Sequence, residues 1–133
     1  IFLFELPYFV FREICVVLHI DVSIATISVT SFSSYKLKLF KSVSDILQES
    51  MGNTQVLDLT GCSLDAILYF VNRDIPVLAL LQNGEAVLIT GFNEYNVVIM
   101  EPAKGSLYKK GINDSAEWFL ENGNCFITYV QKE

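Results

Sequence analysis

The chain has 133 residues, of which 52% are hydrophobic and 18% are charged, and its formal net charge at pH 7 is −6. This length predicts one domain with a single core, and the apolar composition excludes a disordered chain. Basic residues do not cluster, and Lys109-Lys110 is the one local pair, so we expect no nucleic-acid partner.

Residues that bind metals or form disulfides are few. The cysteines Cys15, Cys62 and Cys125 show no CxxC spacing and are odd in number, so the sequence predicts neither a disulfide framework nor a zinc site. His19 is the single histidine of the sequence, which is too few for a His-based metal cluster. We therefore expect no metal and no cofactor.

Residues 1–40 form an apolar segment that differs in character from the rest. Its apolar and β-branched run has no clear caps, so strands and a buried helix both remain open. Charged residues interrupt every window long enough to cross a bilayer, so we expect no membrane span and no signal peptide. The first residue is Ile1, which suggests a fragment or a processed form. An apolar segment of this size is also a candidate surface for homo-oligomer formation.

From residue 41 the signals become conventional. A short helix is predicted after the cap Ser42, with Gly52-Asn53 as its stop, and a strand is predicted over 55–59. A stronger helix should follow residues 60–63 and end at 72–74. Its apolar stripe comprises Leu64, Ile67, Leu68 and Val71. The all-apolar run 77–81 then predicts a strand that is buried on both faces.

A meander of strands follows. Asn83-Gly84 is a hairpin signal, and Pro102 should end the third strand of this region because proline cannot donate to a ladder. Residues 113–115 should cap a helix that carries Trp118. The strands predicted from this part of the sequence are Ala86–Phe92, 97–100, 106–110 and 125–130. The mixture of helices and antiparallel strands predicts an α+β fold.

Three segments carry a resemblance to a known family. Residues 75–80 read Ile-Pro-Val-Leu-Ala-Leu, residues 83–92 are Asn-Gly-Glu followed by an apolar strand ending Gly-Phe, and residues 97–102 are an apolar strand ending Glu-Pro. In this order they resemble the C-terminal half of the bacteriocin-processing, double-glycine leader peptidases, which are papain-like cysteine peptidases. The resemblance implies that residues 41–133 form a papain-like domain, an antiparallel sheet packed with helices. It also implies a bacterial protein of the cell envelope or a secreted one.

The same alignment assigns the catalytic positions. Glu85 falls where the family has its catalytic histidine, and Glu101 falls where the family has its orienting aspartate. A cysteine nucleophile needs a partner that stabilises the thiolate and later protonates the leaving amine, and imidazole does both. A carboxylate would instead raise the pKa of a neighbouring thiol. The resemblance therefore implies a cysteine peptidase homologue that has lost catalysis and still binds peptide.

The nucleophile is harder to assign. Cys15 is the candidate, although no glutamine precedes it as in the family. Cys62 lies at a helix start, where a thiol can be reactive, and His19 lies four residues after Cys15 and could serve as its base. Two alternatives thus stay open: an active thiol hydrolase that uses Cys15 or Cys62 with a non-standard base, and a non-catalytic structural or oligomerisation module. Glu85 with Glu101 could also form a carboxylate pair for acid–base work or cation binding.

Overall fold

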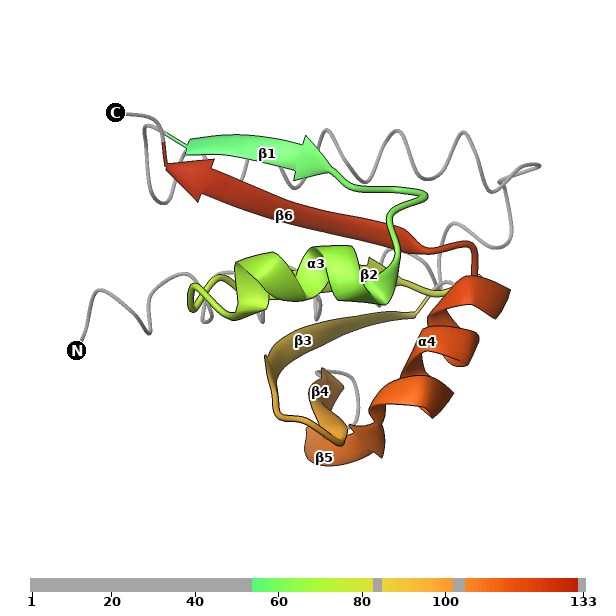
Figure 1. Ribbon diagram of the computed structural model, residues 1–133. Coiled ribbons are helices and arrows are strands. Elements are labelled where there is room, and N and C mark those ends of the chain that lie inside the picture. Colours follow the sequence, from blue (N-terminus) through green and yellow to red (C-terminus); the bar gives the residue numbers. More distant parts are fainter. Residues whose placement is uncertain (1–53, 83–84, 102–104, 132–133) are drawn as a thin grey trace.

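The computed structural model describes residues 54–82, 85–101 and 105–131, in which one antiparallel sheet is accompanied by two helices (Figure 1). The strands are β1 Thr54–Asp58, β2 Val77–Leu80, β3 Ala86–Phe92, β4 Asn96–Glu101, β5 Ser106–Gly111 and β6 Cys125–Gln131, and the helices are α3 Leu64–Val71 and α4 Ile112–Glu121. The predicted α+β class is confirmed. The short helix predicted between Ser42 and Gly52 and the segment 1–40 lie outside the described residues.

The sheet order departs from chain order at one strand. The order is β1-β6-β2-β3-β4-β5, so the last strand lies between the first two. It pairs antiparallel with both, through Leu57 opposite Thr128 and Leu78 opposite Ile127. Strands β2 to β5 follow one another as a meander of antiparallel neighbours. Among the described strands, β1 and β5 are therefore the outermost ones.

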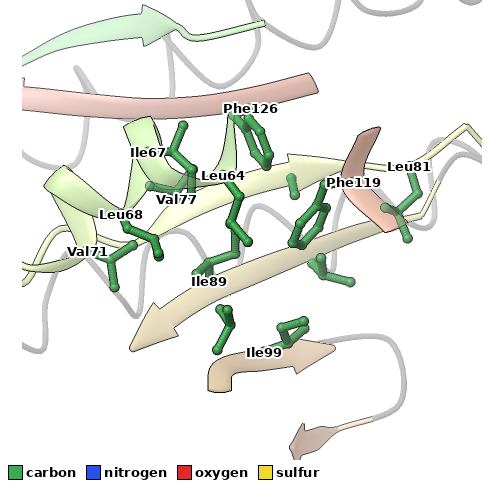
Figure 2. Packing of buried hydrophobic residues seen from close by; sticks show 13 residues of the cluster. Leu64, Ile67, Leu68, Val71, Val77, Leu81, Ile89, Ile99, Phe119 and Phe126 are labelled. Atoms are coloured by element: carbon green, nitrogen blue, oxygen red, sulfur yellow. The ribbon is translucent and has the colours of Figure 1, made fainter. Parts of the chain in front are cut away.

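Both described helices pack on one face of the sheet, here called the first face. Figure 2 shows the side chains of α3 and Phe119 of α4 directed toward the strands. Together these side chains form a hydrophobic core, here called the core cluster. Its sheet residues are each at most 1% exposed, and they are Val77, Ala79, Val87, Ile89, Val97, Ile99 and Phe126. These residues share the first face because side chains two positions apart in a strand point to the same side of the sheet.

Helix α3 begins and ends as its sequence predicts. Ser63 is the N-cap, and its hydroxyl accepts a hydrogen bond of 3.3 Å from the backbone N–H of Ala66. Asp65 lies in the first turn, where the helix dipole favours an acid. At the other end the N–H of Asn72 donates to the Leu68 carbonyl, and Asp74 takes a left-handed conformation with φ of 61°. The helix stops there because a left-handed residue breaks the helical run.

The predicted cap of the second helix is wrong. Residues 113–115 lie inside α4, which begins at Ile112 directly after β5, with Gly111 as the N-cap. No side chain caps this end. The N–H of Ile112 instead donates to the carbonyl of Tyr95 at 2.8 Å. A backbone carbonyl of the β3–β4 turn therefore accepts a hydrogen bond from the first residue of the helix. Because Tyr95 lies 17 positions before Ile112, the sequence around residue 112 gives no sign of this cap.

The opposite side of the sheet, here called the second face, carries a continuous row that crosses all six strands. The cross-strand pairs Asp58–Ile127, Ile127–Leu78, Leu78–Leu88, Leu88–Met100 and Met100–Leu107 make up this row. Ile127, Leu78 and Leu88 are at most 1% exposed and Met100 is 5% exposed, whereas Leu107 on the edge strand is 63% exposed. The row is thus buried in its centre and open at the β5 edge.

Candidate functional site

Glu85 and Glu101 lie at the same end of the β3–β4 pair. Glu85 immediately precedes β3, and Glu101 is the last residue of β4. The register pairs Leu88 with Met100, so Glu101 comes level with Val87, and Glu85 lies two residues further out. Alternation places both glutamates on the first face. The resemblance required these two positions to be neighbours, and the strand register is compatible with that requirement.

Glu101 accepts a hydrogen bond from a residue of the neighbouring strand. The hydroxyl of Tyr108 donates to Oε1 of Glu101 at 2.8 Å. Tyr108 lies directly opposite Ile99, two residues before Glu101, so its phenol ring reaches diagonally along the first face. Both residues are half-buried. Burial is the main cause that raises the pKa of Tyr108 above its ordinary value, and the hydrogen bond and the charge of Glu101 add to it.

The chemistry open to this pair is limited. A phenol whose pKa lies above its ordinary value of 10.0 keeps its proton at neutral pH. General acid–base catalysis needs a pKa near the working pH, so Tyr108 is not suited to transfer protons there. The hydrogen bond can orient the Glu101 carboxylate, and it restrains the side chain at the end of β4.

Glu85 occupies the base of the β2–β3 hairpin. Its carbonyl accepts a hydrogen bond of 2.8 Å from the N–H of Leu81, and the residue is half-buried. Glu85 is therefore not a fully solvated turn residue. Asn83 and Gly84, which carried the hairpin signal, lie outside the described residues.

The two described cysteines differ in exposure. Cys125 opens β6, is 3% exposed, and has its Sγ 3.8 Å from the hydroxyl of Thr60. Cys62 is partly buried against the core cluster and precedes the N-cap Ser63, so it lies just outside α3. Its N–H donates to the Leu59 carbonyl at 3.0 Å. Cys62 thus lies in a turn rather than in the first turn of the helix.

Two further predicted site residues, Cys15 and His19, lie outside the described residues. Their relation to Glu85 and Glu101 stays a prediction. Within residues 54–82, 85–101 and 105–131, no three His, Cys, Asp or Glu side chains come together as a group that could hold a metal ion. Neither α3 nor α4 is long and apolar enough to cross a membrane.

Sequence reasoning missed Tyr108 as the partner of Glu101. Tyr108 is half-buried, whereas Tyr95 of the β3–β4 turn is 75% exposed. A weak signal was present in the sequence: Tyr108 lies in an alternating strand that follows Glu101 after a short turn. Without the register, however, either face and several partners were possible.

Comparison with known proteins gives a fold and no family. No family model matches the sequence, and no curated protein is significantly similar to it. Among solved structures, a candidate C39-like peptidase from Bacillus anthracis matches with a TM-score of 0.57 and 19% sequence identity. The match covers 71% of this chain and 60% of that protein, so this chain spans less than two thirds of its neighbour's length. The described residues therefore share the fold of a C39-like peptidase.

Proposed function

We propose that this chain is a C39-like peptidase domain that has lost thiol-based catalysis and retains the ability to bind a peptide segment. The observation that carries the proposal is the pairing of Glu101 with Tyr108. In the peptidases that the sequence resembles, the acid at this position orients the catalytic imidazole. Here Glu101 accepts a hydrogen bond from the Tyr108 hydroxyl, and Glu85 occupies the position where the family has its histidine.

The chemistry of the two glutamates supports the loss of activity. A thiol beside Glu85 would meet a carboxylate, which disfavours the thiolate by like-charge repulsion. In the family the imidazole also protonates the leaving amine, and this position of the chain holds no imidazole. Binding of an extended peptide does not need either group. A bacterial protein of the envelope or a secreted one would suit a domain of this kind.

Thiol reactivity tests the proposal directly. The rate of iodoacetamide labelling at Cys15, Cys62 and Cys125 would be measured on the folded protein between about pH 5 and pH 9 by mass spectrometry, beside a fluorogenic peptide assay. We expect slow labelling, with no thiol titrating well below its free value of about 8.5, and no hydrolysis. Fast labelling of Cys15 or Cys62 together with loss of a hydrolytic activity would overturn the proposal in favour of a working thiol hydrolase.

A pair of variants tests the assigned position. Glu85→His restores the residue that the family has at this position, and Glu94→His places the same residue in an exposed bend of the β3–β4 turn as a control. If the assignment is right, Glu85→His alone should speed the labelling of one cysteine near neutral pH, because imidazolium favours a neighbouring thiolate. Equal effects of the two variants would argue against a nucleophile close to residue 85.

A further inference from the structure

The outer edge of β5 differs from the rest of the described surface in charge. The described residues contain three cationic side chains, Arg73, Lys109 and Lys110, against nine acidic ones. Two of the three cations thus lie on one edge strand. Lys110 is engaged on the first face, where its Nζ lies 4.6 Å from the centroid of the Trp118 ring. Lys109 points to the second face and is exposed.

The same edge carries an exposed apolar side chain, and no other described strand lies beside it. Leu107 is 63% exposed and ends the second-face row that runs through Leu88 and Met100. Among the strands that the structure describes, β5 pairs with β4 and with no other. Every second residue of an edge strand directs its N–H and C=O away from the sheet, so an added strand can bond to them. A side chain of such a strand would extend the row and cover Leu107.

We propose that the outer edge of β5 is a binding site for an extended acidic peptide segment, which adds to the sheet as a seventh strand. On the second face, an apolar side chain of the segment packs on Leu107, and an acidic side chain two positions along it pairs with Lys109. Spacing by two follows from strand alternation. The recognised chemistry is therefore an apolar residue and a carboxylate on one face of an extended chain.

A second copy of this chain fits the edge less well. Residues 106–111 contain two lysines and no acid, so pairing of β5 with itself would bring the lysines of both copies to one seam. Lysine on an edge strand is a common means of preventing such self-pairing. An acidic partner removes the same repulsion, which is why charge complementarity favours it.

The probe would be the labelled peptide Thr-Val-Thr-Glu-Thr-Val, followed by fluorescence anisotropy with the full chain. Its matched controls are the peptide with Lys in place of Glu and a peptide N-methylated at alternate backbone amides. We expect binding of the acidic peptide that weakens with salt, and weak or no binding of the two controls, because one lacks the charge and the other lacks the strand hydrogen bonds.

Protein variants locate the site. Leu107 and Lys109 are exposed, so their replacement should leave the melting temperature unchanged. Lys109→Gln and Leu107→Thr should each weaken binding by about threefold to tenfold. Lys109→Glu should reverse the preference toward the Lys-containing peptide. Arg73→Gln, which removes an exposed cation in the turn after α3, should change nothing.

Several outcomes would overturn the inference. These are equal binding of the acidic and basic peptides, no effect of N-methylation, equal effects of Lys109→Gln and Arg73→Gln, absence of binding up to the solubility limit, or a dimer that Lys109→Glu abolishes. The inference is independent of the proposed loss of catalysis. Binding that Glu85→Gln abolishes and Lys109→Gln leaves intact would place the peptide near Glu85, which contradicts the β5 site and favours the proposed function.

Discussion

The hydroxyl of Tyr108 donates a 2.8 Å hydrogen bond to Glu101 across the antiparallel pair of β4 and β5. Tyr108→Phe removes the donor and leaves a half-buried carboxylate with one partner fewer. We expect it to lower the free energy of unfolding by about 1 to 2 kcal/mol, measured by urea denaturation. Tyr95→Phe, which removes a hydroxyl from an aromatic that is 75% exposed, is the matched control and should change stability little.

Glu101→Gln tests the cause of the Tyr108 pKa. Glutamine keeps an acceptor for the hydroxyl and removes the negative charge. The pKa of Tyr108 should fall and yet stay above its ordinary value of 10.0, because burial is the largest cause of the shift. A spectroscopic titration of tyrosinate, with Tyr108→Phe used to assign the band, measures this. A pKa that rises, or stays the same, would show that the carboxylate has no part in the shift.

Ser115→Ala should stabilise the protein. Ser115 is fully buried on α4, and its Oγ makes no hydrogen bond in the part of the chain that the structure describes. Alanine removes this buried polar group and favours the helix, so we expect a gain of about 1 kcal/mol or more. Asn113→Ala, at an exposed position of the same helix, controls for helix propensity. A gain for Ser115→Ala no larger than that of the control would mean that the hydroxyl has a partner in solution.

Tyr129 should contribute to alkaline unfolding. It is 4% exposed, and burial raises its pKa to about 12 from 10.0. The folded state therefore holds the phenolic proton more tightly than the unfolded state. Its contribution is fully present below about pH 10 and is lost as the pH rises toward about 12. Urea denaturation between about pH 8 and pH 11 should show falling stability, with a smaller fall in Tyr129→Phe. An identical pH dependence in both proteins would contradict this.

Thr128→Val should destabilise the protein. Thr128 is fully buried in β6, and its hydroxyl donates to the Pro76 carbonyl at 3.0 Å. Valine keeps the shape and leaves the carbonyl without this donor, so we expect a loss of about 1 to 3 kcal/mol in thermal or urea unfolding. The same change at Thr90, which is half-buried in β3, is the control and should cost less. Equal losses would assign the effect to general packing.

The sequence by itself determined the local elements. The apolar stripe and the break at residues 72–74 sufficed to predict α3, and the all-apolar run after Pro76 sufficed to predict a strand buried on both faces. The strand Ala86–Phe92 was predicted with its observed bounds. These predictions succeed because periodicity, capping and turn chemistry act between residues that are close in the chain.

The tertiary structure decided what depends on partners distant in the sequence. It placed β6 between β1 and β2, began α4 at Ile112 against the carbonyl of Tyr95, and paired Tyr108 with Glu101. It also left Leu107 and Lys109 on an open edge, although their strand alone does not distinguish an edge from a centre. The physical reason is register: a strand's pattern fixes which residues share a face, whereas cross-strand hydrogen bonds and packing fix which residues meet.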